Sequence, residues 1–194
     1  MDIFSSRYRI AIEYCGLYYH SSLFKSKDYH RKKFNLCKKR DIRLITLFED
    51  EWLLKREIVL SYIFYSFNIF EKIIPSNECV ILSIDHETAS SFLEDNHIQG
   101  KTSSEHSFGL FYGDALVYVA SVESLNKDTL ELKRFCSKRG WNIIGSFVSI
   151  LNYILSFAKK DSFKNIQYCS DLRWETGDSL KAFGFIKKYE NPYM

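Results

Sequence analysis

The order of apolar segments along this 194-residue chain constrains its fold most strongly. Short runs rich in β-branched and aromatic residues alternate with longer segments whose apolar residues recur at helical spacing. Two prolines and eight glycines leave no room for a Pro-rich or Gly/Ser-rich linker. Such an alternation is typical of an α/β protein.

The first turn signal after a long apolar stretch, Pro75-Ser76-Asn77, predicts a domain over 1–75 and a second over 76–194. The elements expected in the first domain are strands over 2–5 and 10–14, a helix over 28–40, a strand over 42–48 and a helix over 52–70. The two first strands form a hairpin in which Ser5 faces Ile10 and Asp2 faces Glu13.

The second domain is expected to be a mixed sheet with helices. Its predicted strands cover 80–84, 108–111, 116–122, 130–136, 165–168 and 185–189, and its predicted helices cover 87–95, 143–159 and 177–183. The Tyr112-Gly113-Asp114 segment predicts a hairpin turn between the second and third of these strands.

Charge is unevenly placed along the chain. The whole sequence carries +3, but residues 1–75 hold fourteen Lys and Arg against nine Asp and Glu. Nine of these basic residues fall between Lys25 and Arg43, beside only two acids. A cluster of this kind either forms a solvated helix face or meets the phosphates of a nucleic acid.

The composition excludes several classes of protein. No apolar run approaches the roughly 18 residues of a membrane helix, and the start of the sequence has no signal-peptide pattern. Five cysteines without a CxxC pair fit reduced thiols better than a disulfide framework or a zinc site. We therefore expect a cytoplasmic protein with no membrane partner.

The densest group of residues with catalytic potential is Asp2, Glu13 and His20. Opposed carboxylates across a hairpin repel each other, so they suit a divalent cation, most often Mg²⁺. A backbone carbonyl from the second strand could add a ligand, and a histidine could act as general base or acid. The alternative interpretation is that all three are ordinary surface residues.

Several blocks within residues 2–52 match one family in order and spacing. They are Asp2-Ile3-Phe4, Ile10–His20, Tyr29-His30, Leu36-Cys37, Ile42–Ile45 and Phe48–Trp52. These blocks resemble phage-encoded homing endonucleases, a group that looks related to the very-short-patch-repair mismatch endonuclease. The resemblance implies a restriction-endonuclease-like N-terminal half of the PD-(D/E)XK superfamily. It also implies Mg²⁺- or Mn²⁺-dependent cutting or nicking of double-stranded DNA in a bacterial host cell.

The resemblance also implies roles for individual residues. Asp2 and Glu13 would hold the metal together with the main-chain carbonyl of Tyr14, and His20 would assist proton transfer. Cleavage of both strands by one active site would need a homodimer or two sequential nicks. The residues expected to contact DNA phosphates are Lys25, Lys27, Arg31, Lys32, Lys33, Lys38, Lys39 and Arg40.

The second domain resembles a C-terminal domain of the same phage proteins, whose strand–helix order is similar to the acyltransferase (GNAT) fold. The blocks that carry this resemblance include Asn96–Gly100, Leu132–Cys136, Ile144-Gly145 and Ser170–Trp174. A working acyltransferase of that type usually has an Arg/Gln-x-x-Gly-x-Gly/Ala loop that holds the pyrophosphate of coenzyme A. The corresponding segment, Asn142–Phe147, keeps one glycine of that loop.

Three functions therefore stay open. The first is a metal-dependent endonuclease. The second is an inactive DNA-binding or interaction module derived from one, because the family's usual helix before the first strand is missing from this sequence. The third and weakest is an acyltransferase. Further polar candidates are His30, His97, Arg134, Asp171 and Arg173, for which a helix cap or an ion pair is the alternative role.

Overall fold

A computed structural model describes residues 2–16, 29–171, 173–174 and 178–188. The chain divides into two compact units. Unit 1 comprises residues 1–56 and 170–194, and unit 2 comprises residues 57–169. Both units combine strands and helices, so the chain is a mixed α/β protein as predicted. Within the described residues, no helix is long and apolar enough to cross a membrane.

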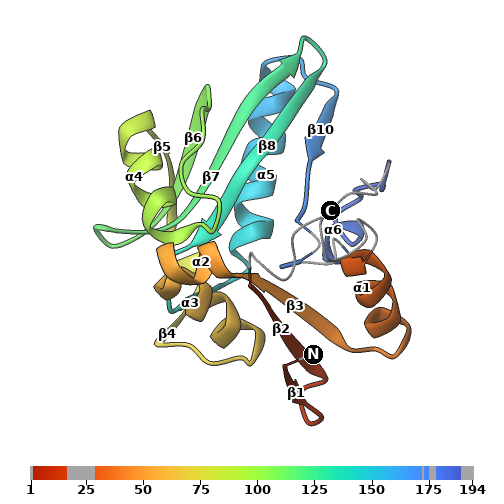
Figure 1. Cartoon of the computed structure of the whole chain (residues 1–194). Helices are drawn as coiled ribbons and strands as arrows, with labels where there is room; N and C mark the ends of the chain where they lie inside the picture. The colour runs from red at the N-terminus through yellow and green to blue at the C-terminus, as the bar shows by residue number, and fades with distance from the viewer. Residues whose placement is uncertain (1, 17–28, 172, 175–177, 189–194) are drawn as a thin grey trace. The chain divides into compact units, whose positions relative to one another are not determined.

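Unit 1 contains a three-stranded sheet in the order β1-β2-β3, drawn in red and orange in Figure 1. Strands β1 (Ile3–Ser5) and β2 (Ile10–Cys15) are antiparallel, and the predicted pairing of Ser5 with Ile10 is confirmed. Strand β3 (Arg43–Phe48) runs parallel to β2 and follows helix α1 (Tyr29–Lys39). The apolar residues buried in β2 and β3 are Ile10, Ala11, Ile12, Cys15, Leu44, Ile45 and Leu47.

The helix predicted over 52–70 is two helices, α2 (Glu49–Leu54) and α3 (Arg56–Ser66). Helix α2 begins three residues early because three acidic residues fill its first turn, where they interact favourably with the helix dipole. The break falls at Lys55, whose φ of −134° is not helical. Unit 1 also contains α6 (Asp178–Lys181). The strand expected over 185–189 is absent from its described residues, 185–188.

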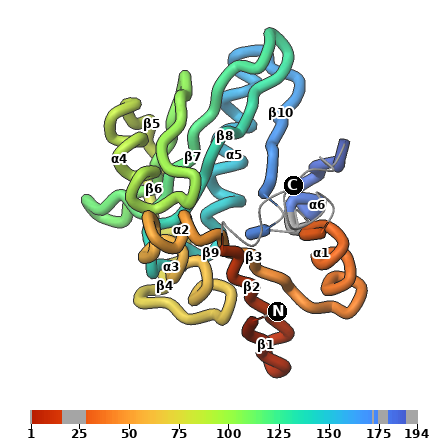
Figure 2. Tube along the Cα trace, in the orientation of Figure 1, coloured from red at the N-terminus to blue at the C-terminus, as the bar shows by residue number. Residues whose placement is uncertain are grey.

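Unit 2 is built on a five-stranded sheet in the order β10-β8-β7-β6-β5. Neighbours from β5 to β8 are antiparallel, whereas β10 is parallel to β8. The strands are β5 (Val80–Ile84), β6 (His106–Tyr112), β7 (Ala115–Asn126), β8 (Thr129–Ser137) and β10 (Asn165–Tyr168). The trace in Figure 2 shows the long β7–β8 hairpin with β10 beside it.

Two separate apolar clusters form in unit 2. Helix α5 (Ser146–Lys160) packs Ile150, Ile154 and Ala158 with sheet residues such as Leu132. Helix α4 (His86–Asn96) packs Ala89 and Leu93 with Val119 and Cys136. Because residues of one strand alternate between the faces of a sheet, these clusters place α4 and α5 on different faces.

The helix predicted to begin at Ile143 begins at Ser146 instead. The residues before it form β9 (Trp141–Ile144), which pairs in parallel with β4 (Lys72–Pro75), so Pro75 lies inside unit 2. A short 3₁₀ helix, η1 (Ser76–Glu78), follows β4. The tryptophan and two isoleucines of β9 favour a strand, and the pairing with β4 stabilises this conformation over a helix.

Candidate functional site

An irregularity in β8 is the first feature of the candidate site. Along the β7–β8 ladder, Ser121 pairs with Arg134 while its neighbour Val122 pairs with Leu132, so Lys133 is an extra residue. One extra residue in one strand is a β-bulge, which bends the strand and redirects its side chains. Bulges are enriched next to active sites, which draws attention to this point of the sheet.

The pairing of β8 with β10 stops at the same place. Its last pair joins Leu132 to Tyr168, and β8 continues to Ser137 with no further strand on that side among the described residues. Lys138 donates its backbone N–H to β7. Alternation along the strand therefore directs the N–H and C=O of Phe135 and Ser137 away from β7. Beyond the bulge, β8 thus presents an open edge of backbone donors and acceptors.

The N-terminus of α5 lies at the carboxyl end of β8, because α5 is the crossover helix between the parallel strands β8 and β10. Gly145 precedes it in a left-handed conformation, with φ of 80°. A Cβ at this position would lie 2.9 Å from Oγ of Ser76, which in turn is 2.8 Å from Oγ of Ser149. The first N–H groups of α5 have no acceptor within the helix.

Aromatic rings flank the open edge of β8. The ring centroid of Phe135 lies 4.9 Å from that of Phe147 on α5 and 5.1 Å from that of Tyr168 on β10. All three side chains are half-buried. The open edge therefore combines hydrogen-bonding backbone with apolar walls, a combination that fits an extended ligand containing both amide groups and methylenes.

The bulge residue Lys133 forms a cluster of charges with two acids. Its ammonium lies 3.0 Å from Glu123 and 3.3 Å from Glu131. The hydrogen bond to Glu123 is the largest influence on this lysine and raises its pKa. Lys133 is therefore a cation at neutral pH, and the cluster fixes the conformation of the bulge.

The two described carboxylates of the predicted metal site have protein partners. The buried carboxylate of Glu13 is in a salt bridge with Lys33 of α1. The exposed Asp2 uses its carboxylate to accept the backbone N–H of Tyr14, at 2.8 Å. The described residues contain no group of three or more His, Cys, Asp or Glu arranged to hold a metal. His20 lies outside the described residues.

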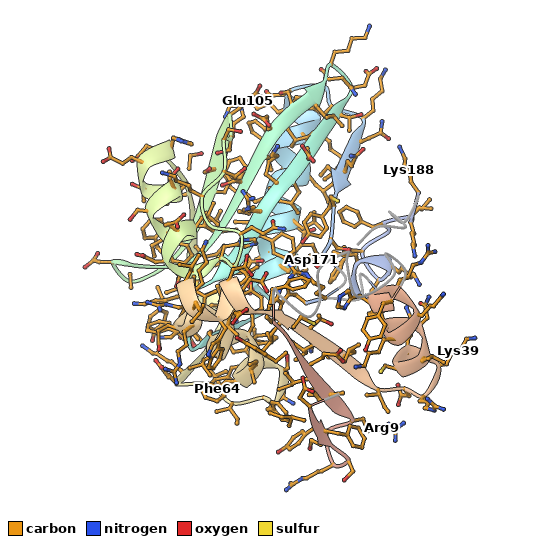
Figure 3. All side chains as sticks on the ribbon, viewed as in Figure 1. Arg9, Lys39, Phe64, Glu105, Asp171 and Lys188 are labelled. Atoms are coloured by element: carbon orange, nitrogen blue, oxygen red, sulfur yellow. The ribbon has the colours of Figure 1, made fainter. Side chains whose placement is uncertain are left out.

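The structure describes six of the eight basic residues expected to contact DNA. Lys25 and Lys27 lie outside the described residues. On and just after α1, Arg31 and Lys33 are half-buried, whereas Lys32, Lys38, Lys39 and Arg40 are exposed. In Figure 3 the side chain of Lys39 points away from the ribbon. The helix contains no acidic residue, so its exposed end carries a local positive charge.

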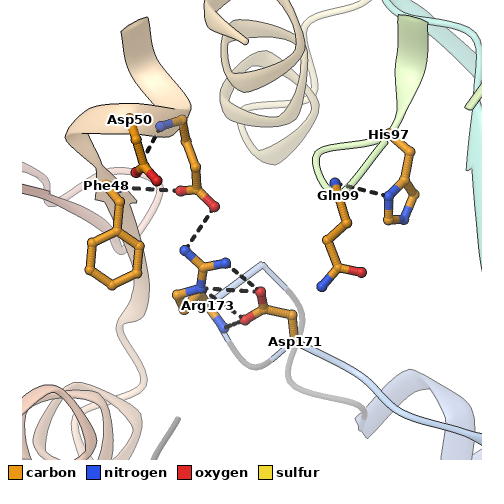
Figure 4. Close-up of polar contacts among 7 residues, drawn as sticks. Phe48, Asp50, His97, Gln99, Asp171 and Arg173 are labelled. Atoms are coloured by element: carbon orange, nitrogen blue, oxygen red, sulfur yellow. Dashed lines mark hydrogen bonds and ion pairs between the residues drawn. The ribbon is translucent and has the colours of Figure 1, made fainter. Parts of the chain in front are cut away.

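Asp171 and Arg173 form an ion pair in unit 1, together with a third residue that sequence reasoning did not select, Glu51 (Figure 4). The guanidinium lies 2.6 Å from Asp171 and 2.9 Å from Glu51, and it stacks 4.8 Å above the ring of Phe48. Burial opposes the charge of Arg173, but its bonds to the two acids outweigh this effect and raise its pKa. Asp171 and Arg173 therefore form the ion pair that was the alternative to a functional role.

The two remaining histidine candidates take part in local packing. His97 ends α4, and its Nδ1 accepts the backbone N–H of Gln99 at 3.1 Å. His30 lies edge-on to Phe48, with ring centroids 5.9 Å apart. Figure 4 draws the His97 contact. In the part of the chain that the structure describes, neither histidine belongs to a group of three or more residues that could hold a metal.

Sequence reasoning missed the bulge at Lys133 and the hydroxyl pair of Ser76 and Ser149. A bulge has no reliable signal in a single sequence, because it depends on the register of two strands. Glycine at 145 was a visible signal, since a left-handed residue often borders a helix, but it was interpreted as lying inside the helix.

Comparisons with known proteins complete the description. No family model and no curated protein matches the chain. Solved structures with a similar fold include a GNAT family acetyltransferase from Elizabethkingia anophelis with acetyl-CoA bound. It is 13% identical, with 56% of this chain and 74% of that chain covered and a TM-score of 0.44.

A GNAT family acetyltransferase of Streptococcus pneumoniae TIGR4 is also 13% identical, with 56% of this chain and 87% of that chain covered and a TM-score of 0.45. A possible acetyltransferase from Clostridium difficile 630 is 12% identical, with coverages of 58% and 93% and a TM-score of 0.45. At such identities the likeness concerns the fold alone.

These findings correct the predicted identity. The prediction of a phage homing endonuclease with a PD-(D/E)XK nuclease core was wrong, because the solved structures similar to this chain include several acetyltransferases. The predicted Mg²⁺ or Mn²⁺ cofactor was wrong for the same reason, and because no metal-binding group exists among the described residues. The restriction-endonuclease-like N-terminal half is likewise unsupported.

Proposed function

We propose that unit 2 binds an acyl-coenzyme A along the open edge of β8 and transfers its acyl group to an amine. The observation that carries this proposal is the coincidence of two features at one point of the sheet. The bulge at Lys133 and the end of the β8–β10 pairing adjoin each other, at the carboxyl end of β8 where α5 begins. In open parallel α/β sheets, ligands bind outside the carboxyl ends of the strands, and β8 and β10 are the parallel pair of this sheet.

The residues at this point fit the parts of coenzyme A. Backbone groups of Phe135 and Ser137 can pair with the amides of its pantetheine arm, beside the aromatic rings. Its pyrophosphate suits the N–H groups that point out of the first turn of α5 and the hydroxyls of Ser76 and Ser149. Gly145 keeps that turn free of a side chain. Strand β9 occupies the position of the glycine-rich loop that acyltransferases of this type usually have. The phosphates would therefore contact the first turn of α5.

Such a ligand, when bound, supplies a thioester carbon: the amine forms a C–N bond to it, the C–S bond breaks, and the amine's proton goes to the departing thiolate. The chain's own contribution is positional. The open edge of β8 orients the ligand in an extended form, and the rings of Phe135, Phe147 and Tyr168 exclude water from it. Fixing two reactants in contact lowers the entropic part of the barrier.

Acetyl-CoA should raise the melting temperature of the protein, since a ligand at about 100 times its Kd adds roughly 2.7 kcal/mol of stability. Val148→Glu should weaken this binding at least tenfold. The new carboxylate stands in the first turn of α5, where it favours the helix but repels a pyrophosphate. The measurements are calorimetric titration and release of free thiol with an amine mixture.

Leu155→Glu is the matched control for that substitution. Val148 and Leu155 lie on the same helix and are 40% and 41% exposed, so both glutamates are solvated. Only the one at position 148 stands near the helix N-terminus. Equal affinity in the two variants, or no binding of acetyl-CoA to the wild type, would refute the proposal.

A second candidate function rests on exposed cations along α1 and directly after it. Lys32, Lys38, Lys39 and Arg40 are exposed, and the helix contains no acidic residue. We propose that this surface binds the phosphates of double-stranded DNA. Contacts to phosphates carry no sequence information, so this binding would be non-specific.

Lys38→Glu/Lys39→Glu should lower affinity for a DNA duplex and reduce the slope of log K against log salt by about two. Lys159→Glu/Lys160→Glu provides the control, because it reverses two adjacent lysines in the last turn of another helix. Fluorescence anisotropy over a range of salt concentrations measures both slopes. Equal slopes in the two double variants would exclude this surface as the binding site.

A further inference from the structure

An arginine on the other face of the same sheet has an unused hydrogen-bonding edge. Nη1 of Arg134 donates to the carbonyl of Lys101 at 3.0 Å. Its Nε is buried, and no partner for it exists within the described residues. A buried N–H without an acceptor is costly and rare. Together with one Nη, Nε forms a side of the guanidinium that can bind a carboxylate through two parallel hydrogen bonds.

The surroundings of Arg134 are polar and built by three neighbouring strands. Ser107, Ser121 and Arg134 are directly paired across β6, β7 and β8, so their side chains stand in one row on one face. The two serines are buried, with their hydroxyls 2.9 Å apart, and Oγ of Ser104 lies 3.1 Å from Oγ of Ser107. A hydroxyl row of this kind offers donors to an anion.

The face is that of α4, since Val119 and Cys136, two residues along from Ser121 and Arg134, pack against this helix. Glu94 of α4 lies close enough for its charge to support that of Arg134, although burial lowers the arginine's pKa. Glu94 also accepts the backbone N–H of Lys101, at 3.0 Å. The row therefore carries a cation beside an exposed carboxylate.

This pair of charges selects the class of ligand. Glu94 repels a doubly charged phosphate more strongly than a singly charged carboxylate, and a carboxylate also matches the guanidinium fork. An ammonium group on the same molecule would interact favourably with Glu94. Arg134 itself is the second residue of the β8 bulge, so this cluster adjoins the point at which acyl transfer is proposed.

We propose that Arg134, with Ser107 and Ser121, binds the carboxylate of the acceptor, and that the amine receiving the acyl group belongs to an amino-acid-like molecule. The role of this ligand as the acyl acceptor rests on the proposed acyl transfer. The binding of a carboxylate by Arg134 does not depend on it. Because Nε is buried and Nη1 is bonded to Lys101, the ligand can enter only when the 97–105 connection moves.

The binding test uses propionate, a carboxylate without an amine. In NMR spectra that detect arginine Nε–H groups, titration with sodium propionate at constant ionic strength should shift one resonance saturably. That resonance should be missing from Arg134→Lys and present in Arg139→Lys, which alters an exposed arginine near the end of the same strand. Propionamide should leave it unmoved. No saturable shift with propionate overturns the carboxylate site.

The turnover test compares L-alanine with L-alaninamide, which lacks the carboxylate. Thiol release from acetyl-CoA should be at least tenfold more efficient with alanine, and Arg134→Lys should remove this preference through KM more than through kcat. Equal turnover of both amines overturns the assignment while leaving acyl transfer intact. A propionate shift without thiol release refutes acyl transfer and leaves the carboxylate site standing.

Discussion

Replacing Lys33 with alanine is expected to lower the free energy of unfolding of unit 1 by about 3–5 kcal/mol. Lys33 is the ion-pair partner of Glu13, whose side chain is only 5% exposed. Removal of the ammonium leaves a buried carboxylate without its counter-charge, on a strand in the middle of the sheet. The glutamate then has to be protonated or the strand has to move, and both cost free energy.

Urea unfolding followed by tryptophan fluorescence measures this loss. A Trp141→Phe background removes the only tryptophan of unit 2, so the signal reports on Trp52 and Trp174 of unit 1. The double variant Glu13→Leu/Lys33→Met should recover most of the stability, because an apolar pair avoids the desolvation cost. A Lys33→Ala loss below about 0.5 kcal/mol would show that the pair is solvated.

Replacing Arg173 with alanine is expected to cost unit 1 about 2–3 kcal/mol, less than a fully buried pair because its partners keep some solvent. The side chains of Arg173, Glu51 and Asp171 are 25%, 16% and 18% exposed. Without the guanidinium, two adjacent carboxylates repel each other. The substitution also removes the stacking of Arg173 on Phe48 at the end of β3.

The same fluorescence measurement tests this prediction. Arg173→Lys should give an intermediate loss, because lysine keeps the charge but not the planar fork. Arg40→Ala alters an exposed arginine of the same unit and should change stability by no more than about 0.5 kcal/mol. If Arg173→Ala and Arg40→Ala had equal effects, the cluster would contribute nothing to stability.

Much of the secondary structure could be predicted where the pattern was local. The strands over 80–84 and 165–168 have the predicted bounds, and the hairpin register of Ser5 with Ile10 follows from the length of its turn. The second half of β9 was predicted as helix, because an apolar run next to an amphipathic helix has the same local pattern. Its pairing with β4 comes from a segment about 70 residues away.

The candidate site could not be predicted in the same way. Glu13 is a predicted metal ligand because two carboxylates that face each other across a hairpin need a nearby positive charge. In the structure, the ammonium of Lys33 supplies a positive charge to Glu13. The alternative to a functional role for Asp171 was an ion pair with Arg173 or Arg134, and the pair with Arg173, two residues away, is the one that forms. Glu51 completes their cluster from a distant part of the sequence, where no pattern marks it.

The sequence by itself determined the mixed α/β class, the direction of its charge asymmetry and the apolar faces of its strands and helices, because these depend on composition and on periods of two or 3.6 residues. Only the tertiary structure decided which strands pair, where β8 gains its extra residue and which charges meet. Pairing, bulges and ion pairs depend on the register between distant segments, where a shift of one residue reverses the face of every side chain.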